Sequence, residues 1–469
     1  MDLVLRSACE LSRSILRGEL SAVELVEASL ARVATANGAV NAVVTLNERA
    51  VEEARALDER RARGEAIGPL DGLPVGIKDV TPVAGLRTTY GSRLYADFVP
   101  AEDAEVVRRL RAAGAVVLGK TNTPEFATGA NTFNEVFGRT RNPWNLERSA
   151  GGSTGGGAAA LATGMIALAE GTDLGGSLRI PAAFCGVVGL RPSPGLVPTW
   201  PTDYLWDTLQ VTGPMARRAE DVALALQAMA GPGPCSPIGQ PVEGRDFVAA
   251  VAAADPRGVR VAYAPDLARI GVDPAIEAIC RSAALELRHA GAAVEELELD
   301  LEYGRRAFLA LRGYWMVAQQ HARLDRLERF GDNLRGNVEA GLRRSVLELA
   351  EAETLRGRLW EDLRRLFEGC DLLLTPTVAV PPFPVTQNYP DSIGGRPMKT
   401  YVDWIAPTFV LSLAGLPVAS VPAGLDREGM PVGLQIVGPP RGEEAVLAMA
   451  RVIQEARPIG SPNPGGRSG

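Results

Sequence analysis

Two serines, Ser153 and Ser177, lie in the stretch of the chain that is richest in glycine, and each follows a Gly-Gly pair. Glycine lets the backbone come close to a ligand, and successive free N–H groups in such a turn form a concave surface of donors for negative charge. In acyl transfer, a hydroxyl acts as the nucleophile and such donors stabilise the oxyanion that forms. Flexible linkers are also rich in Gly and Ser, but these runs are flanked by compact apolar segments such as 158–164. We therefore expect an acyl-transfer site around the two serines.

A serine nucleophile needs a base, and histidine is scarce in this chain. His289 ends a helical pattern, where a cation is favourable, and His321 lies in a charged helical stretch. Lys78 ends a short apolar strand between Pro74 and Pro82. Its charge could reach water at the sheet end, or burial could lower its pKa and make it a neutral base. The scarcity of histidine favours the second interpretation.

Residues 114–121, Gly-Ala-Val-Val-Leu-Gly-Lys-Thr, formally match the nucleotide-binding P-loop. A P-loop needs a flexible turn between its glycines and a helix after it. Here the four intervening residues are apolar and themselves predict a strand, and Pro124 disfavours a helical conformation just before it. We interpret the segment as the end of a buried strand.

Composition excludes several classes of function. The chain has 469 residues, 46% of them hydrophobic, which is ample for a core. A net charge of −7 argues against a nucleic-acid partner. The five scattered cysteines lack metal-ligand spacing and are typical of free thiols in a reducing compartment. Without a signal-peptide pattern or an apolar stretch of membrane-spanning length, we expect a cytoplasmic protein with no membrane partner.

Alternating strand and helix patterns up to about Val188 predict an α/β sheet. A capping box at Ser21 opens a helix that we expect to end near residue 34, followed by a strand over 39–46. Residues 302–368 predict a helical, cap-like region. The segment from 458 is rich in Pro, Gly and Ser and predicts a disordered tail.

Several longer segments carry a family resemblance. They are Gly-Leu-Pro-Val-Gly-Ile-Lys-Asp at 72–79, the glycine-serine region 151–182, Arg-Asn-Pro-Trp-Asn at 141–145, and the segments 185–193, 374–377, 415–417 and 433–440. In order and spacing they resemble the amidase signature family. The resemblance implies one α/β/α domain over 1–469, with a large mixed twisted central sheet covered by helices and a signature core at about 60–215. The chain departs from the family pattern at Thr154 and Gly157.

The resemblance also implies the roles of individual residues. Ser177 corresponds to the nucleophile, Ser153, preceded by a cis peptide bond, to the bridging serine, and Lys78 to the base. Asp173 and Arg179 match signature positions and are expected to support the loop. The implied oxyanion hole consists of the backbone N–H groups of Leu174, Gly175, Gly176 and Ser177. The mechanism implied requires no metal or organic cofactor.

The variable segments bear on the substrate. Tyr204 and Trp206 follow the signature, and Trp315 lies on an apolar face of the helical region. We expect these aromatic residues to bind substrate, although they could simply fill the core. Aromatic pocket walls favour aryl or alkyl groups. We therefore expect a stand-alone amidase, monomer or homodimer, that acts on small neutral apolar or aryl amides, with carbamates (urethanes) as a further class and urethanase activity as the result.

Two alternatives stay open. The glutaminase (A) subunit of a tRNA-dependent amidotransferase shares the signature, but the stretch from Tyr204 to Gln210 is aromatic where such subunits carry a Ser-Leu-Asp-Gln-like run. A catalytically silent binding module is the alternative from another class, and the complete set of Ser177, Ser153 and Lys78 argues against it. The sequence does not identify the amide.

Overall fold

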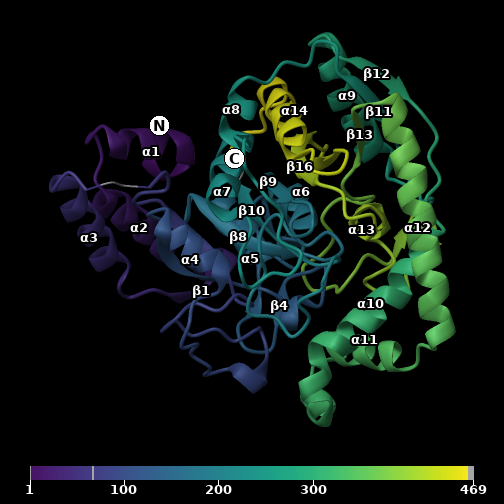
Figure 1. Ribbon diagram of the computed structural model, residues 1–469, viewed down its shortest axis with the longest axis horizontal. Helices are drawn as coiled ribbons and strands as arrows, with labels where there is room; N and C mark the ends of the chain where they lie inside the picture. Colours follow the sequence, from purple (N-terminus) through teal and green to yellow (C-terminus); the bar gives the residue numbers. More distant parts are fainter. Residues whose placement is uncertain (1, 66–67, 463–469) are drawn as a thin grey trace.

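The computed structural model describes residues 2–65 and 68–462 and is built around one sheet of 11 strands (Figure 1). The strand order is β1-β3-β2-β8-β10-β9-β16-β17-β13-β11-β12. Parallel pairs occur near both ends of the sheet, and antiparallel pairs fill its middle from β8 to β13. The predicted α/β architecture with a large mixed central sheet is confirmed.

The strands of this sheet are β1 (Val43–Leu46), β2 (Pro74–Lys78), β3 (Val116–Thr121), β8 (Leu168–Asp173), β9 (Val188–Arg191), β10 (Val211–Ala216), β11 (Arg260–Tyr263), β12 (Ala293–Glu296), β13 (Leu372–Pro376), β16 (Val418–Leu425) and β17 (Pro431–Val437). Three short two-stranded sheets pair β4 (Phe133–Asn134) with β5 (Gly138–Arg139), β6 (Arg141–Asn142) with β7 (Asn145–Ser149), and β14 (Ser392–Ile393) with β15 (Arg396–Pro397).

The helices are α1 (Ala8–Leu16), α2 (Ala22–Val40), α3 (Ala50–Ala62), α4 (Glu105–Ala112), α5 (Gly155–Ala162), α6 (Arg179–Cys185), α7 (Ala219–Met229), α8 (Phe247–Ala252), α9 (Pro274–His289), α10 (Gly304–Gln320), α11 (Asp332–Leu342), α12 (Val346–Gly369), α13 (Ala406–Leu413) and α14 (Glu443–Ala456).

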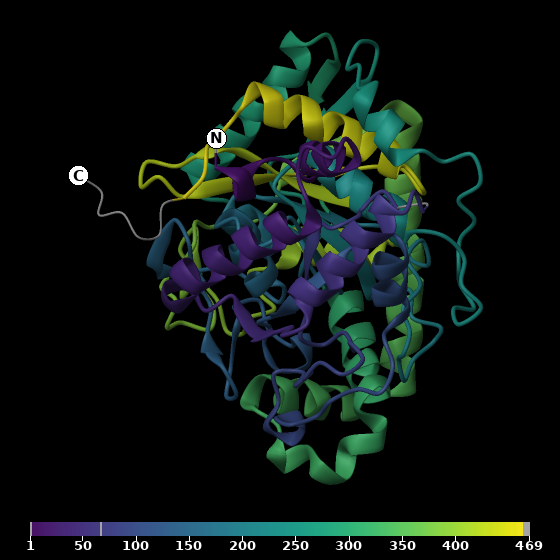
Figure 2. The same cartoon turned by 90° about the vertical axis from the view of Figure 1, so that its left-hand side faces the viewer.

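Helices cover both faces of the sheet because its strands are buried on both sides. Along β3, Val117 belongs to one apolar cluster, whereas Val116 and Leu118 belong to another, as expected when successive side chains point to opposite faces. Helices α7, α9 and α14 pack on one face, and α5 and α6 pack on the other. Figure 2 shows α14, in yellow, lying across the strands of matching colour.

The predicted helical region is confirmed as α10, α11 and α12, which form one flank of the molecule (Figure 1). A capping box at Ser345 opens α12, the longest of the three. The region is fixed to the sheet domain by apolar contacts, since Phe308 of α10 stacks on Phe409 of α13 with ring centroids 4.1 Å apart. Position 308 therefore faces inward, towards the centre of the protein.

The structure corrects one boundary near the N-terminus. Helix α2 continues to Val40 instead of ending near residue 34, and the strand expected over 39–46 begins only at Val43. The helix ends because Asn41 adopts a left-handed conformation (φ 55°), which Asn tolerates better than most residues. Residues 458–462 of the predicted tail form no regular element, and 463–469 lie outside the described residues.

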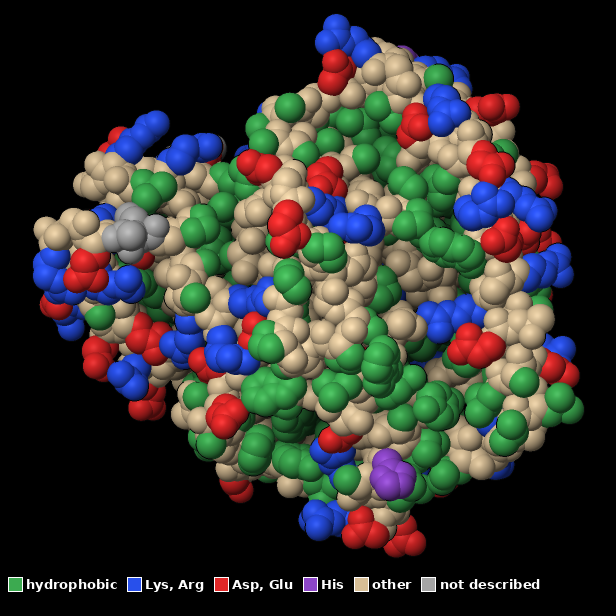
Figure 3. Space-filling model, viewed as in Figure 1, with side chains coloured by type: hydrophobic (Ala, Val, Ile, Leu, Met, Phe, Trp, Pro, Cys, Tyr) green, Lys and Arg blue, Asp and Glu red, His purple; other side chains and the backbone are tan. Residues whose placement is uncertain are grey.

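Strand β3 runs through Gly119, Lys120 and Thr121, so the P-loop-like segment is a strand, as interpreted. Figure 3 shows basic and acidic side chains interspersed over the visible face, without one large block of a single sign. In the described part of the chain, no helix combines the length and the apolar character that crossing a bilayer requires.

Candidate active site

Lys78 is the last residue of β2, the third strand from one edge of the sheet, and is fully buried. Its Nζ lies 2.7 Å from Ser153 Oγ, 2.9 Å from Thr172 Oγ1 and 3.0 Å from Thr154 Oγ1. All three partners are hydroxyls, each of which can either donate or accept a hydrogen bond. The surroundings of the amine therefore suit its neutral form as well as its charged form.

Burial lowers the pKa of Lys78 to about 7, although the carboxylates of Glu170 and Asp173 act in the opposite direction. Glu170 accepts a hydrogen bond from the backbone N–H of Lys78 at 3.1 Å. An amine with this pKa is substantially deprotonated at neutral pH. Lys78 can therefore take a proton from a neighbouring hydroxyl.

Ser153 is fully buried just before α5, and the peptide bond between Gly152 and Ser153 is cis. The chain is crowded here. A Cβ on Gly152 would lie 2.9 Å from backbone atoms of Ala130 and Asn131, which is closer than real Cβ contacts. Glycine at 152 is thus required by the close approach of two backbone segments, and this packing fixes the position of the Ser153 hydroxyl beside Lys78.

Ser177 lies in the loop between β8 and α6, is partly exposed, and lines the same cavity as Ser153. The two serine loops are linked by a hydrogen bond from the backbone N–H of Thr154 to the carbonyl of Ser177, at 3.1 Å. The structure shows no hydrogen bond between the two serine hydroxyls. Hydrogen bonds between catalytic groups are often longer in a free enzyme and shorten when substrate binds.

One of the four N–H groups expected to form the oxyanion hole has a hydrogen-bond partner within the loop. The N–H of Gly176 donates to Asp173 Oδ1 at 2.8 Å and is therefore not available to a substrate. Within residues 2–65 and 68–462, the N–H groups of Leu174, Gly175 and Ser177 have no hydrogen-bond acceptor. Three of the four expected donors thus remain free to stabilise an oxyanion.

Asp173 holds this loop in place through a buried ionic network. Arg179 contacts its Oδ1 at 2.9 Å and Arg191 contacts it at 3.5 Å, and all three side chains are fully buried. Burial by itself would raise the pKa of Asp173, but the two guanidinium groups and the N–H of Leu178 keep it far below its ordinary value. Asp173 and Arg179 therefore have the supporting position that the sequence predicts.

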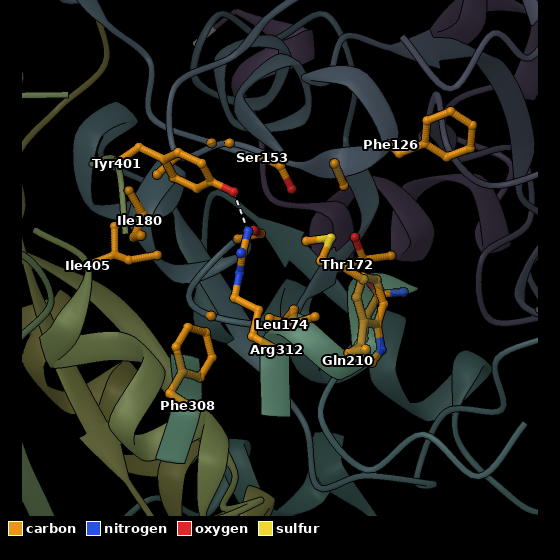
Figure 4. Close-up of a pocket in the computed structure, with 18 residues that line it drawn as sticks. Phe126, Ser153, Thr172, Leu174, Ile180, Gln210, Phe308, Arg312, Tyr401 and Ile405 are labelled. Atoms are coloured by element: carbon orange, nitrogen blue, oxygen red, sulfur yellow. Dashed lines mark hydrogen bonds between the residues drawn. The ribbon is translucent and has the colours of Figure 1, made fainter. Parts of the chain in front are cut away.

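The cavity beside the serines has an inner and an outer part. Figure 4 shows the residues that line the inner part. The inner part, of about 30 Å³, is lined by Ser153, Ser177, Leu174, Ile180, Phe308, Arg312, Met316, Tyr401 and Ile405, among others. The outer part, of about 210 Å³, is lined by residues including Tyr90, Trp200, Thr202, Gln319 and Arg323. Both parts share Phe126, Ala127, Thr172, Gln210 and Trp315, so they form one continuous space.

Of the three aromatic residues predicted to bind substrate, only Trp315 lines this space. Its indole N–H donates to Asp207 Oδ2 at 2.5 Å, which fixes the ring. Trp206 is 66% exposed and lines neither part. Tyr204 also lies outside both parts and packs edge-on against Tyr314. The segment around 206 turns away from the cavity, so proximity to the signature in sequence does not bring these two residues to the serines.

Sequence reasoning missed Arg312 and Tyr401, which line the inner part of the cavity. Arg312 follows Phe308 by four positions and precedes Trp315 by three, which places all three on one face of α10. A single arginine within an otherwise apolar helical face was the available signal. Tyr401 comes from an irregular segment before α13 and had no such signal.

Both histidines are exposed on the surface. Among the described residues, no cluster of three or more His, Cys, Asp and Glu side chains is arranged to hold a metal ion. Lys78 is thus the basic side chain that lies within hydrogen-bond distance of Ser153.

Comparisons with known proteins agree with this geometry. The family model described as Amidase matches residues 24–447. An acylamidase from Rhodococcus erythropolis is 36% identical over 470 residues, which is 98% of this chain and 97% of that protein. The A subunit of the glutamyl-tRNA(Gln) amidotransferase from Moorella thermoacetica is 37% identical, with 97% of each protein covered. The crystal structure of a bacterial aryl acylamidase of the amidase signature family has a TM-score of 0.90 at 29% identity, covering 98% of this chain and 99% of that one.

The chain therefore belongs to the amidase signature family. It is a C–N hydrolase of that family, and its fold is the family's mixed α/β fold. The amidase and amidotransferase relatives are similar to it to nearly the same degree, so sequence identity alone does not distinguish between their substrates.

Proposed function

We propose that this protein is a serine amidase in which Ser177 attacks the substrate carbonyl. Neutral Lys78 accepts a proton from Ser153, and Ser153 accepts one from Ser177 as the new C–O bond forms. The tetrahedral oxyanion accepts hydrogen bonds from the N–H groups of Leu174, Gly175 and Ser177. The C–N bond then breaks, and the amine leaves with the proton that the relay returns. Water, deprotonated through the same relay, releases the acyl group as a carboxylic acid.

The observation that carries this proposal is the contact of a fully buried lysine amine with a buried serine hydroxyl, at 2.7 Å. A buried amine with no carboxylate in contact is costly to keep charged. A lysine with a lowered pKa is therefore suited to the role of a base at neutral pH. This arrangement is difficult to explain as a purely structural one.

For the substrate, we propose small amides with an apolar or aryl group, and carbamates of the same kind. Phe308, Trp315 and Ile405 provide apolar walls close to the serines. The acylamidase and aryl acylamidase relatives support this class. Attack on a carbamate has the same geometry at the carbonyl. When the amine has left, water would release the acyl group as a carbonic acid monoester, which loses carbon dioxide to give the alcohol.

The second candidate is the glutaminase subunit of a tRNA-dependent amidotransferase. The observation in its favour is the 37% identity to such a protein over nearly the whole of both chains. Faster ammonia release from glutamine than amine release from any anilide or carbamate would favour this candidate.

The proposal is tested by labelling with a fluorophosphonate and locating the adduct by mass spectrometry. We expect the adduct on Ser177 and loss of anilide hydrolysis in Ser177→Ala. The variant Ser345→Ala, at the remote start of α12, serves as the control and is expected to retain both labelling and activity. An adduct on a different serine, or undiminished activity of Ser177→Ala, would refute the assignment.

A further inference from the structure

Arg312 is a buried cation in the inner cavity without a counter-ion. Its side chain is on α10, and the residue is only 6% exposed. Its guanidinium donates to Asn337 Oδ1 and to the Tyr401 hydroxyl. No Asp or Glu of the described chain forms an ion pair with it. Buried arginines are normally paired with a carboxylate, so this one has the capacity to bind an anion.

Tyr401 adds a second donor at the same place. Its phenolic oxygen accepts hydrogen bonds from Arg312 and, at 3.2 Å, from Asn337 Nδ2. Both donors approach the oxygen, and the Tyr401 O–H itself has no acceptor within the described part of the chain. A phenol can donate one hydrogen bond while it accepts others. Its hydrogen is therefore free to bind a ligand in the cavity, beside the guanidinium (Figure 4).

The inner cavity has no negative charge of its own. Its lining includes Arg312 but neither Asp nor Glu. A planar guanidinium with an adjacent O–H is well matched to a carboxylate, which accepts several hydrogen bonds in one plane. A zwitterionic amino acid such as glutamine would find no carboxylate there to pair with its ammonium group. The chemistry of the lining thus favours a plain carboxylate.

We infer that the preferred substrates are amides whose acyl chain ends in a carboxylate, which Arg312 and Tyr401 bind. This inference rests on the amidase function proposed above and names its substrate class. The carboxylate belongs to the acyl side because Arg312 lines the small part of the cavity that holds both serines. The larger outer part receives the aryl or alkyl amine. The proposed substrate thus combines an apolar amine with an anionic acyl end, whereas the sequence alone predicts a neutral amide.

The test compares two anilides of nearly equal size, glutaranilic acid and 5-oxohexananilide, in which a methyl ketone replaces the carboxylate. We expect kcat/KM to be about 10- to 100-fold higher for the acid, as a charge-assisted hydrogen bond allows. The ratio should fall close to one in Arg312→Met, partly recover in Arg312→Lys, and fall several-fold in Tyr401→Phe.

The matched control is Arg306→Met, because Arg306 is on the same helix but is exposed and paired with Glu351. This variant should keep the wild-type ratio. Thermal melting shows whether each variant is folded. If Arg312→Met does not fold, the ratios measured for Arg312→Lys and Tyr401→Phe decide the outcome. Equal kcat/KM for the two anilides in wild type, or a preference confined to 4-acetamidobenzoate, where the carboxylate is on the amine, would overturn the inference.

A binding measurement separates failure of this inference from failure of the proposed function. Calorimetry with Ser177→Ala protein should show glutaranilic acid binding at least tenfold more tightly than the ketone. Hydrolysis of the ketone anilide without any preference for the acid would refute the inference alone. Tighter binding of the acid without turnover of either anilide by wild type would refute the amidase proposal alone.

Discussion

Lys78 and Lys120 lie on neighbouring parallel strands, β2 and β3, and both are fully buried. Their partners differ. Lys78 Nζ contacts three hydroxyls. Lys120 Nζ donates to the carbonyl of Thr81 and to Thr88 Oγ1, and it lies 3.9 Å from the carboxylate of Asp79. The two lysines share a sheet and a degree of burial but not an electrostatic environment.

This difference shows that burial alone does not create a base. Burial lowers the pKa of Lys78 to about 7 and that of Lys120 to about 8. A carbonyl oxygen can only accept hydrogen bonds, and a nearby carboxylate favours the charged amine. The Lys120 amine is therefore a structural cation, whereas the hydroxyls around Lys78 can exchange protons with it. The partners, more than the loss of water, distinguish Lys78, the proposed base, from Lys120.

The largest effect is expected from Lys78→Met. Removing the base should lower kcat/KM for an anilide by on the order of 10⁴–10⁶, as for other residues that act as one catalytic unit. The steady-state rate of aniline release measures this, with circular dichroism to confirm the fold. As a control, the double variant His289→Ala with His321→Ala should keep nearly full activity. Loss of activity in that folded double variant would contradict a lysine base.

A smaller effect, and one on stability, is expected from Lys120→Met. Removing one partner of a buried charged pair typically costs about 3–5 kcal/mol. Urea unfolding should show a loss of this size, while kcat/KM of the folded enzyme changes less than tenfold. Lys399, which is exposed, supplies the control, and Lys399→Met should change neither quantity. A loss of activity in Lys120→Met as large as that in Lys78→Met would abolish the distinction between the two lysines.

The smallest effect is a shift of the pH profile in Glu170→Gln. Activity requires the neutral amine, so kcat/KM should rise with pH through about 7, the pKa of Lys78. The Glu170 carboxylate raises this pKa, and its removal should therefore move the rise to lower pH. The exposed Glu428 offers a control, since Glu428→Gln should leave the profile unchanged. A shift to higher pH in Glu170→Gln would contradict the electrostatic account of Lys78.

Short-range sequence patterns predicted the α/β architecture and the position of Lys78 at the end of a strand. They succeeded because strand burial and Gly-Gly-Ser turns are local properties. A further local signal went unused. The chain has only three lysines among its 49 basic residues, and two of the three are fully buried.

Long-range contacts could not be predicted in the same way. Arg312 and Tyr401 are 89 positions apart and meet only because α10 packs against the segment around α13. The hydrogen bond from the N–H of Gly176 to Asp173 likewise exists only in the folded loop. The exposure of Trp206 likewise depends on the path of an irregular segment. Pocket composition is a tertiary property, and sequence order is a poor guide to it.

Phe308, which stacks on Phe409, belongs to the wall of the cavity. This wall and the residues proposed to react come from different stretches of the sequence. Lys78, Ser153 and Ser177 lie before residue 180, whereas α10 and the segment that leads into α13 contribute Phe308, Arg312, Trp315, Met316, Tyr401 and Ile405 to the lining of the inner part. A mutant library confined to 308–316 and 401–405 would therefore alter this part of the cavity lining while leaving Lys78, Ser153 and Ser177 unchanged.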